Sequence, residues 1–349
     1  MTGEHKKDRI LIGAESTKTK RRAVRMFLMN STGMLASFSC RELMDTAAEA
    51  IKAANSPESG EITAPLRTTV KRENDSLLLM PCLTSETWAL KVLTLFPGNP
   101  GKGRPFLNGL VLLFEGEDGT PSAVMDGRIL TALRTGSVGG LGVRTLSRPD
   151  VASLGIIGAG AQGYWQVRFA CAARPFSRVF IFDVKRENAE NLSNKLRVDL
   201  PDVEIRVCGG AAELVAMSEV IITATTSRSP VFPEKPDLFR DRCFVGIGSY
   251  TPDMREYPDC FFDEVKTVFV DTLHALSETG DLIDPINAGT LKRETVRPLS
   301  SLFSSGTGFI PGEGSVLFKS VGVSVFDLYA AKNILSAGRR LGEGIEFTL

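Results

Sequence analysis

Two hydrophobic patterns alternate along the middle and second half of the chain. Short strand-like runs, most of them mainly apolar, recur at residues 151–157, 178–182, 203–207, 220–224, 244–248 and 268–271. Segments with a helical spacing of apolar residues lie at 187–197 and 211–217, between the second, third and fourth runs. Continuous apolar runs of this length are typical of parallel strands that helices cover on both faces. This part of the sequence therefore predicts a doubly wound, Rossmann-type α/β domain.

The first part of the chain has a different pattern. Residues 39–54 place apolar side chains on one face of a helix that Ser39 can cap. Short strand-like runs follow at residues 67–70, 76–81, 88–95, 107–115 and 122–125, and an antiparallel sheet fed by one helix is the simplest account. A glycine-rich segment at 136–146 is expected to form a helix that packs closely on a neighbour. The last helix is expected at 323–337.

Length and composition limit the class of protein. A chain of 349 residues favours two domains, and 43% apolar with 23% charged residues is typical of soluble globular proteins. Basic and acidic residues are equal in number, 41 of each, so no basic excess points to nucleic acid. No apolar run reaches the ~20 residues of a membrane-spanning helix. We therefore expect neither nucleic acid nor a membrane as a partner.

Cysteine and histidine usage argues against several kinds of site. The six cysteines are scattered without a C-x-x-C pair, and there are only two histidines. We therefore expect free thiols in a reducing, cytoplasmic setting, no metal site and no Ser-His-Asp triad. Residues 1–32 are irregular and rich in Lys and Arg, so we expect a disordered N-terminal extension, with a targeting peptide as the alternative.

The apolar run at 151–157 leads directly into Gly158-Ala159-Gly160-Ala161-Gln162-Gly163, a G-x-G-x-x-G turn. In such a turn Gly158 allows the tight bend, Gly160 lets a pyrophosphate approach the backbone, and Gly163 lets the helix pack on the strand. The N–H groups at the start of the following helix then face the phosphates. Strand, glycines and helix in this order predict a dinucleotide site, whereas the glycines alone would also fit an ordinary turn.

The acid that follows the glycine turn bears on which dinucleotide binds. Asp183 lies twenty residues after Gly163, at the end of the second apolar run, where a carboxylate can accept hydrogen bonds from both ribose hydroxyls. A carboxylate there repels a 2′-phosphate, so NAD is favoured. Lys185 and Arg186 follow closely and leave NADP open.

Three cations are candidates for binding an anion: Arg67, Lys91 and Arg134. Lys91 lies inside the apolar run 89–93, and a lysine buried in a strand needs an acidic partner or a ligand anion. Arg134 is expected to open the glycine-rich helix, where its guanidinium and the helix N-terminus can bind one carboxylate together. The alternative for each cation is an exposed charge or a surface salt bridge.

From about Met34 to its C-terminus the chain resembles the ornithine cyclodeaminase/mu-crystallin family. The motifs that carry the resemblance are, in order, PLRT at 65–68, VMDGRILTALRTG at 124–136, GIIGAGAQG at 155–163, GSYTPDMRE at 248–256 and FKSVG at 318–322, followed by Asp327. The resemblance implies that a Rossmann domain, residues 148–319, is inserted in an α+β substrate-binding and dimerisation domain formed by residues 33–147 and 320–349. It also implies a homodimer that binds NAD(P) and a small amino or imino acid with an α-carboxylate.

The motif positions and the strand ends assign candidate residues to each part of the site. The substrate candidates are Arg67, Lys91, Arg134 and Val321, and the catalytic candidates are Lys91, Arg134 and Asp327, a candidate partner for either cation. The cofactor candidates are Gly158, Gly160, Ala161, Gln162, Gly163, Asp183, Thr223, Thr225, Gly248, Tyr250 and Ser320, with Asn108 where the family often has Ser or Thr near the nicotinamide.

One departure from the family pattern decides which reaction we expect. Ornithine cyclodeaminases of this family carry a catalytic aspartate in a G-G-D-C-P loop, and Tyr250 takes its place here in Gly248-Ser249-Tyr250-Thr251-Pro252. A phenol with a pKa near ~10 shuttles protons poorly. Packing over the nicotinamide is the alternative role for Tyr250.

We therefore expect an NAD(P)-dependent oxidoreductase that acts on the C–N bond of an α-amino or imino acid, with Lys91 as proton donor or acceptor. Amino-acid dehydrogenases and ketimine reductases both fall in this class. One alternative is ornithine cyclodeaminase, an ammonia-lyase that uses NAD without net redox change. The other is a mu-crystallin-like protein that binds NADPH without turnover.

Overall fold

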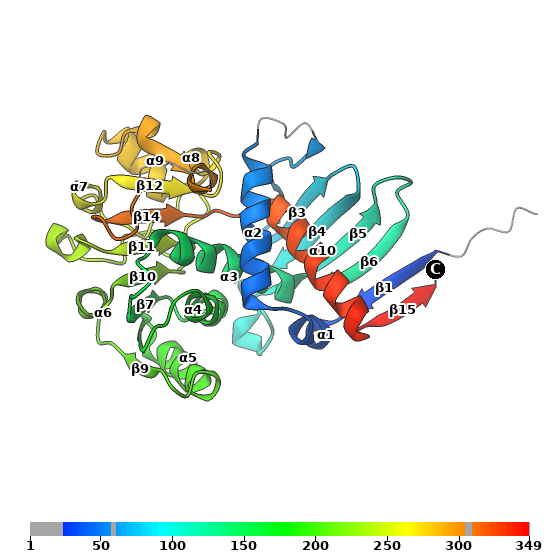
Figure 1. The fold of residues 1–349 in the computed structure, drawn as a ribbon, viewed down its shortest axis with the longest axis horizontal. Coiled ribbons are helices and arrows are strands. Elements are labelled where there is room, and N and C mark those ends of the chain that lie inside the picture. Colours follow the sequence, from blue (N-terminus) through cyan, green and yellow to red (C-terminus); the bar gives the residue numbers. More distant parts are fainter. Residues whose placement is uncertain (1–23, 57–60, 304–308, 349) are drawn as a thin grey trace, which may run out of the picture.

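The computed structural model describes residues 24–56, 61–303 and 309–348, and the strands of these residues form two separate sheets (Figure 1). The first sheet has the strand order β15 (Ile345–Thr348), β1 (Arg25–Met29), β6 (Pro121–Asp126), β5 (Leu107–Glu115), β4 (Thr87–Leu95), β3 (Asp75–Leu83) and β2 (Thr68–Arg72). The second has the order β13 (Val296–Pro298), β12 (Thr267–Val270), β14 (Val316–Lys319), β11 (Cys243–Gly246), β10 (Val220–Thr223), β7 (Ser153–Ile157), β8 (Arg178–Phe182) and β9 (Glu204–Val207).

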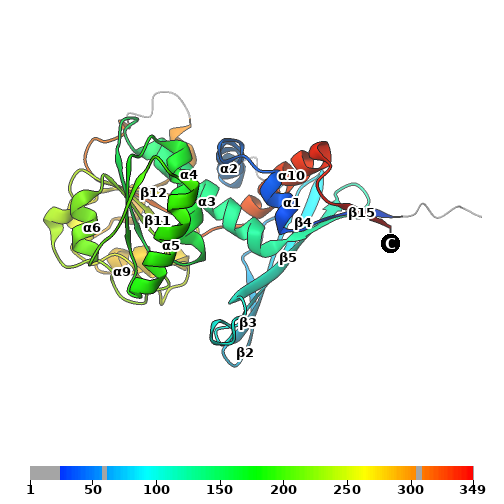
Figure 2. The same cartoon turned by 90° about the horizontal axis from the view of Figure 1, so that it is seen from below.

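The second sheet confirms the doubly wound pattern that the apolar runs predict. Its described strand pairs are all parallel, and α4 (Ala161–Ala173), α5 (Arg186–Asp199) and α6 (Ala211–Met217) join successive strands. Figure 2 shows α4 and α5 on one face of this sheet and α6 on the other. The strand order reverses between β7 and β10, so the carboxyl ends of these strands form the crevice where such sheets bind ligands. Short helices α7 (Phe261–Glu264), α8 (Ala275–Glu278) and α9 (Gly280–Asn287) follow later strands.

The first sheet is larger than predicted. Strands β2 to β6 pair antiparallel, as expected, but β1 joins β6 in parallel and β15 pairs antiparallel with β1. The disorder predicted for residues 1–32 is therefore wrong for residues 24–32, which form β1 and the start of α1 (Ser31–Ala36). The basic residues that suggested disorder mostly precede the strand, whereas Met29 at its end is buried. Residues 1–23 lie outside the described residues.

Helix α3 (Gly127–Leu146) joins the two sheets and begins earlier than predicted, at Gly127 rather than at Arg134. Asp126 ends β6 and caps α3, because its Oδ1 accepts hydrogen bonds from the backbone N–H groups of Arg128 (2.8 Å) and Ile129 (3.0 Å). Arg134 consequently lies about two turns inside the helix. The prediction that Arg134 and the helix N-terminus bind one carboxylate together is wrong.

The glycines of α3 let it pack closely on a helix and on a strand. Close packing of this segment is what the sequence predicts. A Cβ at Gly139 would lie 1.9 Å from Oε1 of Gln166 in α4, and a Cβ at Gly142 would lie 2.4 Å from the ring of Phe318 in β14. At these distances a side chain at either position would force its neighbour to move. α3 therefore fixes where the first sheet lies relative to the second.

One face of the first sheet is covered and the other is open. Helix α10 (Ser324–Leu341) packs on β3 and β4, and α2 (Cys40–Ala54) packs on α10 and α3 (Figures 1 and 2). Ser39 caps α2, as predicted, because its hydroxyl accepts a hydrogen bond from the N–H of Glu42. On the open face Trp88 is 43% exposed and Leu110 is 50% exposed. Exposed apolar side chains grouped in this way are typical of protein interfaces.

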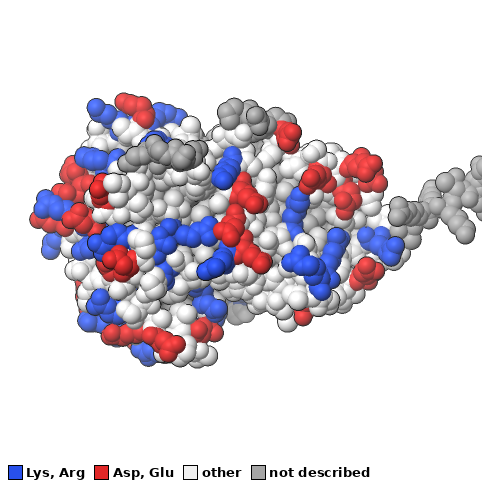
Figure 3. Space-filling view, viewed as in Figure 1, with Lys and Arg blue, Asp and Glu red and all other residues white. Residues whose placement is uncertain are grey.

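The surface carries charges of both signs. On the face drawn in Figure 3, basic and acidic side chains occur side by side, and neither sign covers it continuously. Among the described residues, no helix is long and apolar enough to cross a membrane, and no group of His, Cys, Asp and Glu is arranged to hold a metal ion. All six cysteines are free thiols.

Candidate functional site

A cavity of about 310 Å³ lies between the carboxyl edge of the second sheet and the first sheet. One wall is apolar and consists of residues from β3 and β4: Leu78, Met80, Leu93 and Leu95. The facing wall consists of residues that follow strands of the second sheet: Gly160, Ala161, Gln162, Thr225, Gly248, Tyr250, Ser320 and Val321. Arg67, Lys91 and Arg134 also line the cavity. The structure therefore brings the three predicted cations and the glycine turn to one place.

Asp327 holds two of these cations. Lys91, on β4, is completely buried, and its Nζ lies 2.6 Å from Oδ2 of Asp327 in the first turn of α10. The Nε–H of Arg134 donates a hydrogen bond of 3.0 Å to Oδ1 of the same carboxylate. While Lys91 is protonated, one carboxylate serves two cations, and one positive charge is in excess at the cavity wall. Such an arrangement favours the binding of an anion.

Burial changes the proton affinity of Lys91. The loss of water contact lowers the pKa of its ammonium group from 10.5 to about 7. Asp327 opposes this shift, and the guanidinium groups of Arg134 and Arg67 reinforce it. Both protonation states are therefore present near neutral pH, which suits a group that donates or accepts a proton.

Arg67, which the sequence assigns to the substrate, already contacts groups that follow strands of the second sheet. Its Nη2–H group donates hydrogen bonds to the carbonyl oxygens of Val321 (3.1 Å) and Gly322 (3.2 Å). The same nitrogen lies 3.5 Å from Oε2 of Glu278, and the guanidinium lies 5.6 Å from the ring centroid of Tyr250. Arg67 thus joins the two parts of the molecule across the cavity. Its contact with a substrate stays a prediction.

The glycine turn has the shape that a pyrophosphate needs. Gly158 has a φ of +100°, which favours glycine, and a Cβ on Gly163 would lie 2.5 Å from the carbonyl oxygen of Gly158. A Cβ on Gly160, in contrast, would meet no atom within 4 Å, so the space in front of this backbone is open. The buried Oε1 of Gln162 has no hydrogen-bond partner among the described residues. These observations fit a dinucleotide bound at the start of α4.

Asp183 lies next to this turn. Its Oδ2 accepts a hydrogen bond from the N–H of Ala159 (2.8 Å), and its Oδ1 accepts one from the N–H of Lys185 (2.8 Å). The carboxylate therefore braces the glycine turn from the end of β8. Its contact with ribose hydroxyls stays a prediction.

Thr223 and Asn108, both cofactor candidates, do not offer a side chain to a ligand in the cavity. Thr223 is fully buried and donates its hydroxyl hydrogen bond to Glu256, so it has no surface to offer a cofactor. Asn108 pairs with Thr94 across the strands, on the face opposite Lys91 and Leu93, and donates a hydrogen bond to the carbonyl of Pro105. Burial corrects the prediction for Thr223, and the alternation of side chains along a strand corrects that for Asn108. The motif positions reveal neither.

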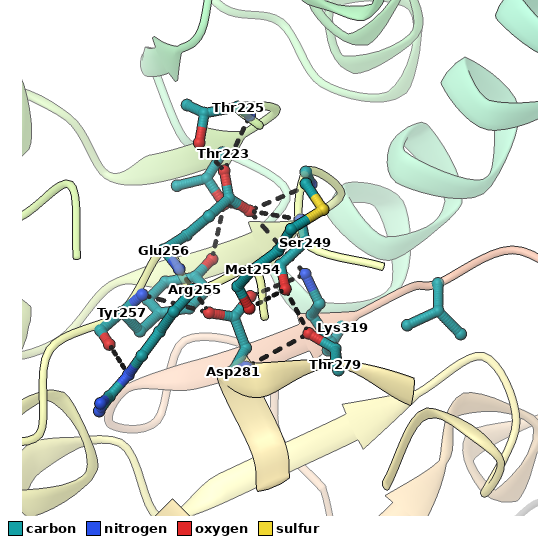
Figure 4. A network of polar contacts seen from close by, with 12 residues as sticks. Thr223, Thr225, Ser249, Met254, Arg255, Glu256, Tyr257, Thr279, Asp281 and Lys319 are labelled. Atoms are coloured by element: carbon teal, nitrogen blue, oxygen red, sulfur yellow. Dashed lines mark hydrogen bonds and ion pairs between the residues drawn. The ribbon is translucent and has the colours of Figure 1, made fainter. Parts of the chain in front are cut away.

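Several polar residues that support the site were missed by sequence reasoning. Glu256, Lys319 and Asp281 form a buried network behind the strand ends (Figure 4). Burial raises the pKa of Glu256, and Lys319 counteracts this. Asp271 accepts hydrogen bonds from the Ser320 hydroxyl and from the N–H groups of residues 321 and 322. Glu256 and Lys319 lie within the quoted motifs, and a lysine in the apolar run 316–321 repeats the signal that marked Lys91.

Comparison with known proteins agrees with this architecture. The model of the ornithine cyclodeaminase/mu-crystallin family matches residues 26–339. A Delta(1)-pyrroline-2-carboxylate reductase of Bacillus cereus is 31% identical over 292 residues, which cover 81% of this chain and 89% of that protein. The ketimine reductase mu-crystallin of Mus musculus is 31% identical over 281 residues, which cover 78% and 84%.

One solved structure resembles this chain over nearly the whole length of both proteins. It is the Delta(1)-pyrroline-2-carboxylate reductase of Thermococcus litoralis in complex with NADH and L-proline. The two chains are 29% identical and superpose with a TM-score of 0.83, covering 92% of this chain and 99% of that chain.

The shared carboxylate of Asp327 generates a prediction about stability. Asp327→Asn leaves Lys91 and Arg134 buried without their common anion, so we expect the free energy of unfolding to fall by about 3–5 kcal/mol near pH ~6. The Lys91 ion pair exists only while Lys91 holds its proton, that is, below its pKa of about 7. The loss should therefore be smaller near pH ~9. Urea unfolding at both pH values measures it.

Asp45→Asn is the matched control. It breaks an ion pair of 2.7 Å with Arg144, but Asp45 is exposed. We expect little change in stability at either pH, because exposed ion pairs are weak. If the Asp327→Asn protein had the same free energy of unfolding as this control at the lower of the two pH values, the role given to Asp327 would be wrong.

Proposed function

Since the chain belongs to the ornithine cyclodeaminase/mu-crystallin family, we propose that it is an NAD(P)-dependent oxidoreductase that reduces the C=N bond of an imino acid bearing a carboxylate on the imine carbon. The observation that carries this proposal is the cluster of Lys91 and Arg134 on Asp327, which faces the glycine turn across one cavity. The similar reductases of cyclic imino acids and ketimines support the choice of substrate class.

The residues present fit a nicotinamide adenine dinucleotide. Gly160, Ala161 and Gln162 would hold the pyrophosphate at the start of α4, because the space in front of Gly160 is open and no described side chain caps this helix N-terminus. Asp183 would bind the ribose hydroxyls and favour NAD, and NADP is the alternative cofactor. The bound dinucleotide supplies the hydride for the reduction.

Arg134 would bind the substrate carboxylate. Asp327 accepts the hydrogen bond from the Nε–H group of Arg134, so the terminal nitrogens of the guanidinium are left for a ligand. Their planar arrangement matches a carboxylate and fixes the imine carbon in one orientation. The apolar wall from β3 and β4 would then enclose the remaining carbon atoms of the substrate.

Lys91 would supply the proton. Reduction of an imine to an amine adds one hydride to carbon and one proton to nitrogen. A buried ammonium group with a pKa of about 7 gives up its proton readily near neutral pH. Asp327, at 2.6 Å, keeps the Lys91 side chain in one position before and after the transfer.

The cavity lining argues against the cyclodeaminase alternative. A diamino acid such as ornithine has a distal ammonium group that needs an acidic partner. None of the described lining residues is Asp or Glu, and Tyr250, in the place of the family's aspartate, lies against the guanidinium of Arg67. This environment favours a substrate with one carboxylate and an apolar body.

We also propose that the protein is a homodimer and acts in the cytoplasm. The open face of the first sheet, which includes Trp88 and Leu110, supports the dimer because a face of this kind is stabilised by burial. The six free thiols are compatible with a reducing compartment.

A substrate screen tests the reaction type. We expect consumption of NADH with pyrroline-2-carboxylate or piperideine-2-carboxylate, in equal amount to the amino acid formed, and none with ornithine. Arg134→Ala should abolish this turnover while NADH still binds. Release of proline and ammonia from ornithine without net NADH change would instead identify a cyclodeaminase. Dinucleotide binding without turnover of any imino acid would identify a binding protein.

The pH dependence of the reduction tests Lys91. Because the protonated form is required, kcat/KM should fall as the pH rises through about 7. Lys91→Met should lower kcat/KM by about 10²–10⁴-fold and remove this pH dependence. Lys332→Met, which removes a partly exposed lysine of α10, is the control and should leave the profile unchanged. A wild-type profile in the Lys91→Met protein would show that Lys91 is not the proton donor.

A further inference from the structure

Two carboxylates and one lysine are buried together behind the wall of the cavity that faces the first sheet (Figure 4). Glu256, Asp281 and Lys319 have no exposed surface. Nζ of Lys319 lies 2.8 Å from Oδ2 of Asp281 and 3.8 Å from Oε2 of Glu256. Buried charges are costly unless they are paired and hydrogen-bonded, so a network of this size needs a reason beyond packing.

Glu256 connects the ends of two neighbouring strands. Its carboxylate accepts five hydrogen bonds, from the Thr223 hydroxyl (2.9 Å), the Thr225 N–H and hydroxyl (both 2.8 Å), the Gly248 N–H (3.1 Å) and the Ser249 N–H (3.2 Å). Thr223 ends β10 and Thr225 follows it, and the other two residues follow β11. Thr225 and Gly248 both line the cavity. One buried carboxylate therefore sets the distance between two segments of the cavity wall.

The contact at Gly248 shows how tight this connection is. A Cβ on Gly248 would lie 2.2 Å from the carbonyl oxygen of Thr225 and 2.4 Å from Oε1 of Glu256. The two strand ends can approach each other only because residue 248 has no side chain and Glu256 accepts the N–H groups on both sides.

Lys319 and Asp281 extend the connection to a third strand end. Lys319 is the last residue of β14 and directly precedes Ser320 and Val321, which line the cavity. Oδ1 of Asp281 accepts a hydrogen bond of 2.6 Å from the backbone N–H of Glu256. The ion pair between Lys319 and Asp281 thus links the end of β14 to the backbone that carries Glu256.

We propose that Glu256 is a positioning residue for the cofactor side of the cavity: it holds the ends of β10 and β11, and with Lys319 and Asp281 the end of β14, at the spacing that binds the dinucleotide. This inference rests on the proposed function. It assigns Glu256 no contact with the cofactor and no part in proton transfer. A carboxylate is suited to this role because it only accepts hydrogen bonds, and all five groups that contact it, from four residues, are donors.

Glu256→Gln tests the proposal with little change in size. Whichever way the amide is turned, its NH2 group meets a backbone N–H, of Thr225 on one side or of Gly248 and Ser249 on the other. We expect the dissociation constant for NADH, measured by fluorescence titration of the full-length protein, to rise at least about tenfold. Catalytic turnover is not needed for this measurement.

Glu219→Gln is the matched control. Glu219 accepts hydrogen bonds from the Ala152 N–H (2.8 Å), the Ser153 N–H (3.1 Å) and the Ser153 hydroxyl (3.0 Å), at the amino edge of the same sheet. This variant loses comparable interactions far from the cavity, so the NADH dissociation constant should stay within about twofold of wild type. An equal rise in both variants would overturn the proposal, because general destabilisation would then explain it.

Thr223→Val decides the question if Glu256→Gln does not fold. Thr223 is buried away from the cavity, so its loss can reach the cofactor only through Glu256 or Tyr257. A rise of a few-fold in the NADH dissociation constant supports the proposal, and an unchanged value overturns it. If wild type binds neither NADH nor NADPH, the proposed function fails and the inference fails with it; if it binds only NADPH, the same titrations are made with NADPH. If wild type binds NADH and a folded Glu256→Gln protein binds it equally well, the inference alone fails.

Discussion

The structure around the cavity depends on one buried carboxylate that two cations share. Asp327 comes from α10, Lys91 from β4 and Arg134 from α3. The cluster therefore holds one strand of the first sheet and two helices together at one point. Burial of the protonated Lys91 would be unfavourable without Asp327, and while Lys91 is protonated the cluster has one positive charge more than Asp327 neutralises. That excess charge, next to an apolar wall, supports the proposed binding of a small carboxylate.

The opposite wall depends on a second buried network with the reverse balance of charge. Glu256 and Asp281 share Lys319. Glu256 also accepts the N–H of Gly248 at a strand end, and Asp281 accepts the backbone N–H of Glu256. Helix α3 connects the walls, because its glycines allow contact with both α4 and β14. Each wall of the cavity is thus supported by its own buried ionic cluster. Arg67 joins the two walls directly, through the carbonyl oxygens of Val321 and Gly322.

Much of this arrangement follows from local pattern. The continuous apolar runs predict the parallel sheet, the glycine turn predicts its ligand edge, and a lysine inside an apolar strand indicates Lys91. The rest depends on contacts between residues far apart in sequence. Nothing near residue 27 indicates that it pairs with a strand at residues 121–126, and nothing near Arg67 indicates the carbonyls of residues 321 and 322. Arg134 does not open its helix, as the sequence suggested, because Asp126 caps that helix and the helix begins at Gly127.

The most direct test of the account follows a single hydrogen atom. NADH carrying deuterium at C4 of the nicotinamide, on one face or the other, is incubated with the protein and pyrroline-2-carboxylate, and the product is analysed by mass spectrometry. If the cation cluster holds the imino acid against the dinucleotide, one of the two labelled forms should transfer one deuterium to the α-carbon of proline. Proline formed without deuterium from either form, or no proline at all while NADH is bound, would contradict the account.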